Sequence, residues 1–239
     1  MPAERLRRQS QVARHRSLAA ILAVPLGAAL VFLGIPQLMA ALLQYRAAAV
    51  LALPAADALA PSVDELKTAI LRLGEADRWW QEPDNTFESA VLLMRLAAPA
   101  SSRDAYDREL LKEAQRQFET SLAEAPANAK AWAALADARR LDGGPSVAAA
   151  AALKMSMQPA RYEPSLLAWR CEMGLALYSV LDDGTKAELD GQIRLLAHRS
   201  LDDLVRLARA SGKIGLVITA LLTDAETLSR FERELRTIK

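Results

Sequence analysis

The chain has 239 residues, and its 30 lysines and arginines nearly balance its 29 aspartates and glutamates, which leaves a formal net charge of +1. This balance excludes both the overall basic field of a typical nucleic-acid-binding protein and the acidic excess of a disordered chain. The single cysteine, Cys171, excludes an intramolecular disulfide, and its apolar neighbours predict a buried, unreactive thiol.

The amino terminus combines a basic segment with a long apolar one. Residues 1–16 carry five arginines against Glu4, and the stretch from Ser17 to Tyr45 is uncharged. About 20 apolar residues suffice to cross a bilayer as a helix, so residues 17–45 are predicted to form a transmembrane signal anchor. We expect Pro25 and Pro36 to kink this helix or to mark its limits.

The arginines also predict the orientation of the chain, because positively charged flanks stay on the cytoplasmic side of a membrane. Residues 1–16 would form a cytoplasmic tail, and the remainder would lie outside the cytoplasm. A cleaved signal peptide is the first alternative, but its apolar region would be too long, since such regions run to about 7–15 residues. A buried hairpin of a soluble protein is the second.

Residues 46–61 are rich in alanine and proline and are predicted to form a short helix or semi-rigid stalk. From residue 62 to 239, apolar residues recur at spacings of three and four, which predicts an all-α domain. Capping boxes mark three expected helix starts, where a side-chain cap precedes an acidic residue by three positions: Ser62 with Glu65, Asn85 with Glu88, and Thr223 with Glu226.

The stretch "NAKAWAALADARR" at 128–140 predicts a helix capped by Asn128, followed by a turn at "DGGPS" (142–146). Trp132, Leu135 and Ala136 have the spacing of a tetratricopeptide first helix. Matches to second-helix positions flank it: Ala114, Phe118 and Pro126 before, and Ala148 after. The chain therefore resembles the tetratricopeptide repeat family over 114–148, and more loosely over 62–182. The chain departs from the family pattern at three positions: Arg139 replaces the usual tyrosine, Ala152 replaces the usual aromatic residue, and Pro159 closes the repeat one residue early. Pro83 could close an earlier repeat, but its distance from Pro126 implies an insertion at 98–104.

This resemblance implies stacked helix pairs with a concave groove that binds a protein partner. By the geometry of the family, the residues facing the groove would be Lys130, Ala133, Asp137 and Arg140. Trp132 and Leu135 would point into the core of the repeat.

A second resemblance covers residues 161–212. Tyr162, Glu163 and Pro164 open a helix, Leu181 and Asp182 mark its end, and a helix rich in leucine and arginine follows. This arrangement resembles the VpsP-like group of membrane-anchored accessory proteins of bacterial exopolysaccharide biosynthesis. From the residues alone, Pro164 suits a first helical turn, and "DDG" at 182–184 is expected to stop the helix.

The apolar stripe of that helix would run through Leu166, Trp169, Met173, Leu177 and Val180, and Leu189, Ile193 and Leu196 would renew it. Arg194 and Arg199 are expected to face solvent. The segment "IGLVITALL" at 214–222 is too short to span a bilayer and is predicted to be buried, with the helix from Asp224 to Lys239 as a cap.

The sequence shows no catalytic or metal-binding motif. Its two histidines, His15 and His198, lie on opposite sides of the predicted membrane, and nothing in the sequence indicates an activating group for a pair of Cys171 with His198. No glycine-rich phosphate loop occurs. We therefore expect neither enzymatic activity nor a metal or small-molecule cofactor.

Trp79 and Trp80 are the strongest candidates for stacking on a sugar or a peptide. The preferred interpretation is structural: one tryptophan packs and the other covers a helix end, because neighbouring helical residues point about 100° apart.

The function predicted from these observations is a non-enzymatic, membrane-anchored scaffold of a bacterial envelope assembly, with exopolysaccharide synthesis or export implied by resemblance. The same resemblance implies an anchor in the bacterial inner membrane and a helical domain in the periplasm. One alternative is a periplasmic scaffold for pilus assembly, secretion or cytochrome maturation. The other is a protein that binds or processes glycans through Trp79 or Trp80.

Overall fold

The structure, a computed structural model, describes residues 2–53, 60–97 and 104–237, and for residues 2–24 it describes only the helical backbone. These residues contain no strand, which confirms the all-α prediction for the described part of the chain. The helices are α1 (Pro2–Leu51), α2 (Val63–Trp79), α3 (Pro83–Leu96), α4 (Ala105–Glu124), α5 (Ala129–Gly143), α6 (Val147–Met157), η2 (Pro164–Leu166), α7 (Leu167–Leu177), η3 (Tyr178–Val180), α8 (Asp183–Arg199), α9 (Leu201–Ser211), α10 (Ile214–Leu221) and α11 (Ala225–Thr237).

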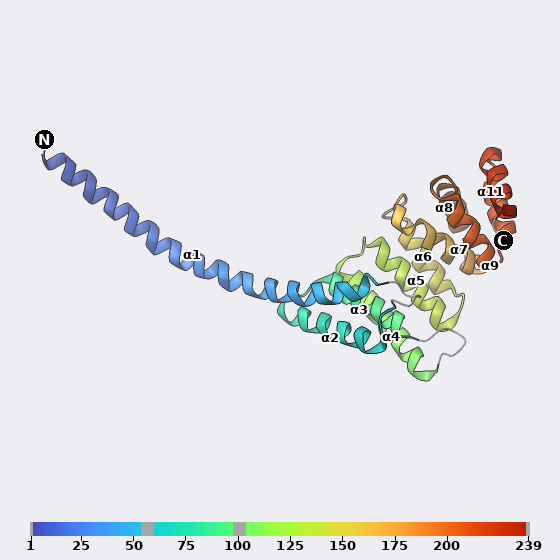
Figure 1. The fold of residues 1–239 in the computed structure, drawn as a ribbon, viewed down its shortest axis with the longest axis horizontal. Helices are drawn as coiled ribbons and strands as arrows, with labels where there is room; N and C mark the ends of the chain where they lie inside the picture. The colour runs from blue at the N-terminus through green and yellow to red at the C-terminus, as the bar shows by residue number, and fades with distance from the viewer. Residues whose placement is uncertain (1, 54–59, 98–103, 238–239) are drawn as a thin grey trace.

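Helix α1 projects far beyond the other helices, with the amino terminus at its free end (Figure 1). It curves, but it continues through Pro25 and Pro36, so neither proline marks its end. The part Pro25–Leu51 is long and apolar enough to cross a membrane, and no other helix in the described residues is. Large apolar side chains from Leu26 to Leu42 are exposed along it.

The last turns of α1 belong to the packed part of the molecule. Ala47 is fully buried in a cluster with Leu66, Ala69 and Leu73 of α2 and with Leu92 of α3. Residues 46–51 of the expected stalk are thus helical and in contact with α2, whereas residues 54–59 lie outside the described part of the chain.

The end of α1 is capped by a side chain from α3. The carbonyl groups in the last turn of a helix have no partner within the helix. Arg95 donates to the carbonyl oxygens of Leu51 at 3.0 Å and Leu53 at 3.1 Å. Together with the buried Ala47, these bonds hold the end of α1 against α2 and α3.

One of the three predicted capping boxes is confirmed. The Ser62 hydroxyl accepts from the Glu65 N–H, and the Ser62 N–H donates to the Glu65 carboxylate at 2.8 Å. The predicted box of Asn85 with Glu88 is wrong, because α3 begins two residues earlier with Pro83 in its first turn. The buried Asn85 side chain instead donates to Asp77 at 2.7 Å.

The box predicted for Thr223 with Glu226 is also wrong, by one residue. Helix α11 begins at Ala225, and the carboxylate that accepts from its first turn is that of Asp224, at 3.0 Å from the Thr227 nitrogen. The capping residue is thus Asp224, which directly follows the predicted Thr223.

Helices α2 to α6 pack mainly against their neighbours in sequence, each connected by a short turn where the chain is described. Asn128 caps α5, as predicted, by accepting from the Ala131 N–H at 3.1 Å. The predicted turn at 142–146 is also present: Gly144 has a positive φ of 80°, and Ser146 caps α6.

Trp132 is a packing residue, as predicted. It is half-buried against the main core, and its indole N–H donates to the Pro126 carbonyl oxygen at 2.9 Å. Leu135 beside it is 1% exposed. Ala148, at the presumed second-helix position, differs from the family pattern because it is exposed, while the next residue, Ala149, is buried.

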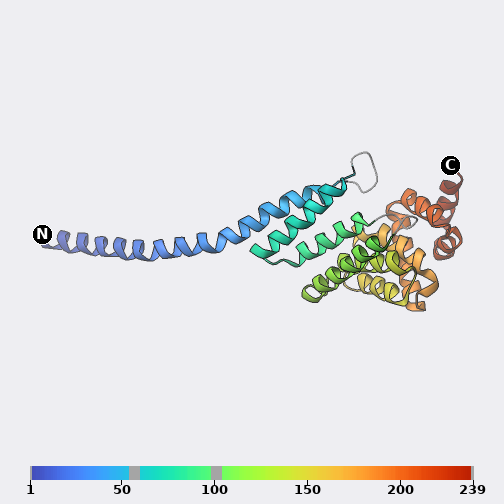
Figure 2. The same cartoon turned by 90° about the horizontal axis from the view of Figure 1, so that it is seen from below.

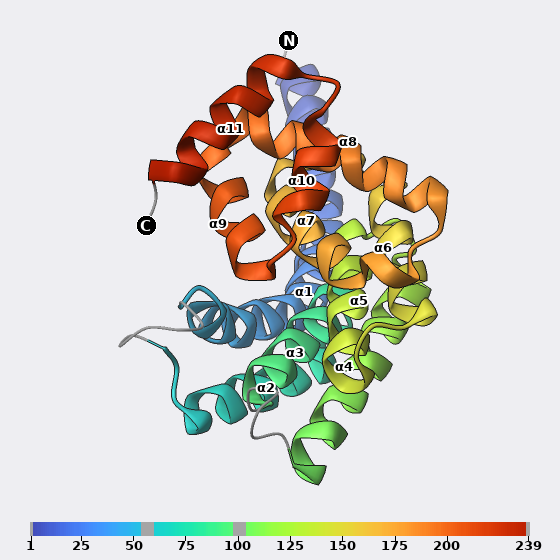
Figure 3. The ribbon, with the colours of Figure 1, turned by 90° about the vertical axis from the view of Figure 1, so that its right-hand side faces the viewer.

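Helices α7 to α11 form a group at the end of the molecule away from α1, with α8 in contact with α7, α9, α10 and α11 (Figures 1 and 3). Pro164 opens η2, which leads directly into α7. The "DDG" sequence does not stop this helical segment, which ends earlier at Val180. Asp182 instead caps α8, where it accepts from the Thr185 N–H at 2.8 Å.

Two further predictions concern the carboxy-terminal helices. Val217 and Leu221 of α10 are fully buried, and α11 contacts α8, α9 and α10, but Leu222 is 63% exposed, so the predicted burial of 214–222 is confirmed only in part. Arg199 is exposed as expected. Arg194 is half-buried and donates to the Ala220 carbonyl oxygen at 3.0 Å, so the expectation that it faces solvent is wrong.

The α6–η2 connection is held by a buried arginine that the sequence did not reveal. Arg170 of α7 has no exposed surface, and its guanidinium donates to the carbonyl oxygens of Ser156 and, at 2.8 Å, of Ala160. Burial lowers the pKa of this guanidinium, and the nearby Glu163 carboxylate opposes that effect. Gln192 of α8 adds a third bond, to the Arg161 carbonyl oxygen at 2.8 Å.

Candidate functional site

A groove of about 480 Å³ lies between α5, α7 and α9. Its apolar lining comes from Met173 and Ala176 of α7 and Leu207 and Ala210 of α9, and charged residues flank it. These charged residues are Arg140 of α5, Glu172 of α7, and Asp203 and Arg206 of α9. An apolar floor with charges of both signs at its rim is the arrangement that receives an amphipathic peptide or helix.

Arg140 is the predicted groove residue that lines this hollow. It is held in place by Asp137, whose carboxylate lies 2.7 Å from the guanidinium. The same carboxylate accepts from the Trp169 indole N–H at 3.4 Å, so Asp137 connects α5 to α7. Asp137 therefore positions Arg140 but does not itself line the groove.

Lys130 lies elsewhere on α5. Seven residues separate it from Asp137, about 10 Å along the helix. Its ammonium group lies 5.1 Å from the centre of the Phe87 ring on α3. Burial and Asp84 raise the pKa of the neighbouring Glu88, and Lys130 partly offsets this rise. Lys130 thus contacts α3 and does not line the groove.

Ala133 was predicted to face the groove and is fully buried, so this prediction is wrong. Glu172, Arg206 and Leu207 also line the groove and were not predicted from the sequence. A signal for α9 exists in "LDDLVRLARAS", where apolar residues at spacings of three and four alternate with charges and predict an amphipathic helix. The pairing of this helix with α5 and α7 depends on tertiary packing.

Trp79 and Trp80 are 47% and 42% exposed. Trp79 is the last residue of α2, and Trp80 follows it in an extended conformation with φ −155° and ψ 113°. Both side chains are therefore exposed, and neither belongs to the buried core clusters.

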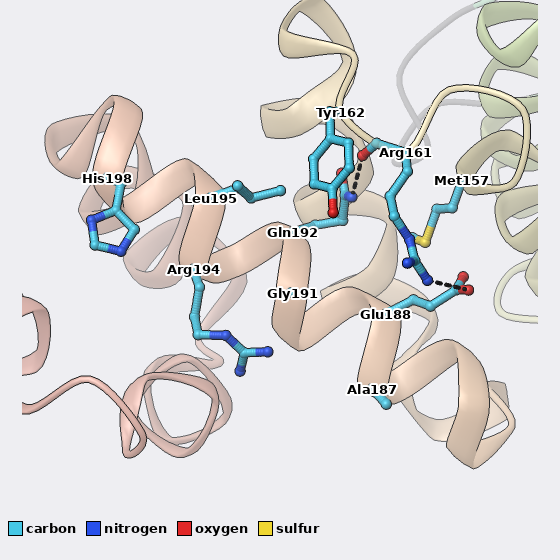
Figure 4. Close-up of a pocket in the computed structure, with 10 residues that line it drawn as sticks. All are labelled: Met157, Arg161, Tyr162, Ala187, Glu188, Gly191, Gln192, Arg194, Leu195 and His198. Atoms are coloured by element: carbon cyan, nitrogen blue, oxygen red, sulfur yellow. Dashed lines mark hydrogen bonds and ion pairs between the residues drawn. The ribbon is translucent and has the colours of Figure 1, made fainter.

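A second hollow, of about 510 Å³, lies between the α6–η2 connection and α8 (Figure 4). Its wall includes Tyr162, which is 70% exposed, and the Arg161 guanidinium, which lies 3.5 Å from the Glu188 carboxylate. His198 at its edge lies 3.2 Å from Asp224. Arg161 and Glu188 therefore pair within the hollow, whereas Arg194 and His198 have partners outside its lining, the Ala220 carbonyl oxygen and Asp224, and these residues show no arrangement of a nucleophile with a base.

Cys171 is buried, and burial raises the pKa of its thiol to about 12. A thiolate is the reactive form of cysteine, so this residue is not an activated nucleophile at neutral pH. Within the described residues, no group of three or more histidine, cysteine, aspartate or glutamate side chains could hold a metal ion.

The inertness of Cys171 leads to a direct prediction. At pH 8, the folded chain should remain unmodified by iodoacetamide under conditions that fully alkylate the chain in denaturant, because the folded thiol is both protonated and inaccessible. Mass spectrometry of the intact protein measures this. Rapid alkylation of the folded chain would show that Cys171 is reachable and that α7 opens readily.

Comparisons with known proteins found no match for this chain among family models, curated proteins or solved structures.

Proposed function

We propose that this chain is a membrane-anchored helical scaffold whose groove binds an amphipathic segment of a protein partner in the bacterial envelope. The observation that carries this proposal is the groove itself, which has apolar side chains on its floor and Arg140, Glu172, Asp203 and Arg206 around it. Stacked helices favour this kind of extended concave surface. The tetratricopeptide resemblance of residues 114–148 supports the same function.

The proposed anchor is α1. It crosses the inner membrane with residues 1–16 in the cytoplasm, because five arginines precede the uncharged stretch. The remaining helices then lie in the periplasm. The groove is formed by helices far from the free end of α1 (Figure 1), which leaves it accessible to a partner in the periplasm.

A role in exopolysaccharide synthesis or export rests on the resemblance of residues 161–212 to the VpsP-like group. The same architecture suits a scaffold of pilus assembly, secretion or cytochrome maturation. Disruption of the gene in its host separates these roles. The amount of secreted polysaccharide should fall only if the chain serves exopolysaccharide synthesis or export.

The groove is tested by blocking it in the full-length chain in native membranes. A photo-crosslinking residue replaces Ala210, and the yield of the covalent adduct between this chain and its partner protein is measured. Ala176→Arg adds a bulky cation to an exposed groove position and should lower the yield by about tenfold or more, the effect of losing about 1.4 kcal/mol of binding free energy. Arg140→Gln should lower it as well.

The matched control is Ala148→Arg, which places the same side chain at an exposed alanine of α6 that does not line the groove. This variant should leave the adduct unchanged. Equal yields from Ala176→Arg and the unmodified chain, or the absence of any adduct at position 210, would show that the groove does not bind the partner.

A further inference from the structure

The paired tryptophans at the end of α2 expose large apolar rings, which is unfavourable in a domain surrounded only by water. Trp79 and Trp80 are adjacent, and each exposes more than two fifths of its surface. Indole rings favour the boundary between lipid and water, where the apolar ring and the polar N–H are both accommodated. Their position relative to α1 decides whether such a boundary is within reach.

The turn between α2 and α3, which carries both tryptophans, lies at the end of the packed domain nearest the free part of α1 (Figures 1 and 2). Helix α2 runs antiparallel to α1 (Figure 2), and Ala47 lies in the same cluster as Ala69. Because two antiparallel helices advance in opposite directions at the same rise, Ala40 lies roughly level with Ala76, and Trp79 roughly level with residue 37.

Two observations limit how much of α1 a membrane can cover. Ala40 is 2% exposed, so the domain already covers α1 at this residue. One turn further, the Gln44 amide donates to Asn85 at 2.8 Å and to Glu82 at 3.0 Å. These polar groups, together with the carboxylate of Glu82, are incompatible with a hydrocarbon environment. The lipid-covered part of α1 therefore ends near Met39, short of the sequence-based limit at Tyr45.

The length of the remaining segment matches a bilayer. From Ser17, where the uncharged stretch begins, to Met39 there are 23 residues, which extend about 34 Å as a helix. The hydrocarbon core of a bilayer is about 30 Å thick, so this segment crosses it with little to spare. The outer edge of the hydrocarbon then falls near residues 37–39, at the level of Trp79 and Trp80.

We propose that the turn between α2 and α3 rests in the headgroup layer of the membrane that α1 crosses, with Trp79 and Trp80 inserted at the boundary between lipid and water. This inference rests on the proposed membrane span of α1. The surface would bind zwitterionic lipid, because the flanking charges, Asp77, Arg78, Glu82 and Asp84, are net negative and offer no attraction to anionic headgroups. With α1 fixed by Arg95, such an anchor holds the domain at a defined tilt on the membrane.

The test uses the full-length chain reconstituted in phosphatidylcholine vesicles that contain lipids brominated either near the headgroup or near the middle of the acyl chain. Bromine quenches indole fluorescence on contact. Two of the four tryptophans are predicted to touch lipid, so headgroup-proximal bromine should quench roughly half of the emission, and mid-chain bromine less. In Trp79→Tyr with Trp80→Tyr, which keeps interfacial side chains but removes their indole emission, this quenching should be lost.

Flotation of the vesicles after an alkaline wash separates the two hypotheses. If the chain floats with the vesicles but quenching is equal in the unmodified chain and the double variant, α1 is membrane-inserted and the tryptophans do not touch lipid. If the chain fails to float, the proposed span is wrong and this inference fails with it. If the tryptophan emission does not respond to brominated lipid but changes when glycan oligomers are added, the tryptophans bind glycan and the lipid anchor is wrong.

Discussion

Phe118→Ala should lower the free energy of unfolding by about 3–5 kcal/mol, because it removes a fully buried aromatic ring from the centre of the main core. Phe118 lies on α4, and its ring centre is 5.7 Å from that of Phe87 on α3. The loss combines the transfer free energy of the ring with the cost of the cavity that remains. Urea unfolding of the full-length chain in detergent, followed by tryptophan fluorescence, measures the change.

Tyr106→Ala provides the matched control, since it removes an aromatic ring from the same helix at a position that is 57% exposed. Its effect should stay within about 0.5 kcal/mol. If both substitutions have the same effect, the packing of α4 on α3 is not the source of stability. A double substitution with Phe87→Ala should also show coupling of about 0.5–1.5 kcal/mol, typical of a pair of aromatic rings.

The features that could be predicted from the sequence are those with a local cause. Ser62 and Asn128 cap helices because their side chains reach an N–H only three residues away. Pro164 opens a helix because its missing N–H costs nothing there. The long apolar helix follows from composition alone. Each of these signals lies within a few residues of the structure it predicts.

Local signals were insufficient where two of them competed. Asn85 with Glu88 has the spacing of a capping box, but Pro83 starts the helix earlier, and Asn85 is then drawn into contacts with Gln44 and Asp77. Those contacts depend on α1 and α2 lying beside α3. No pattern within α3 contains this information.

Local sequence patterns were also insufficient to predict the groove. Arg140 was identified because the repeat pattern places it on a defined face of α5. The opposite wall comes from α9, more than 60 residues later, and α9 reaches it only through its packing on α7 and α8. Lys130 shares a face of α5 with Asp137 and Arg140, yet its ammonium lies over Phe87. Helical spacing thus predicted a shared face but not the neighbour that each residue would meet.

Arg170 is the clearest case of a residue whose role depends on tertiary structure. In the sequence it is an arginine within "LLAWRCEMGLALY", where a charged residue is expected to point to solvent. In the structure it is fully buried and holds the chain between α6 and η2 through two carbonyl groups. The planar guanidinium supplies a donor to the Ser156 carbonyl oxygen and a second donor to the Ala160 carbonyl oxygen, which also accepts from the Glu163 N–H at 3.3 Å.

Arg170→Met should lower the free energy of unfolding by about 1–3 kcal/mol, because it keeps most of the side-chain volume but removes the arginine donor from the Ser156 carbonyl oxygen and one of the two donors to the Ala160 carbonyl oxygen. The α6–η2 connection should also open, which hydrogen exchange of residues 158–163 measures. Arg161→Met is the matched control, since that arginine is mostly exposed and pairs with Glu188 at 3.5 Å. It should change stability by less than about 1 kcal/mol.

The opposite result is physically possible, which makes the measurement decisive. Burial lowers the pKa of Arg170, so the fold disfavours its charged form relative to water, and replacing a buried charge with an apolar side chain stabilises some proteins. We expect the two carbonyl bonds to outweigh this cost, because removing the arginine leaves the carbonyl groups of Ser156 and Ala160 in place. A variant as stable as the unmodified chain, with unchanged exchange at 158–163, would show that those carbonyl groups find other donors and that Arg170 does not hold the connection.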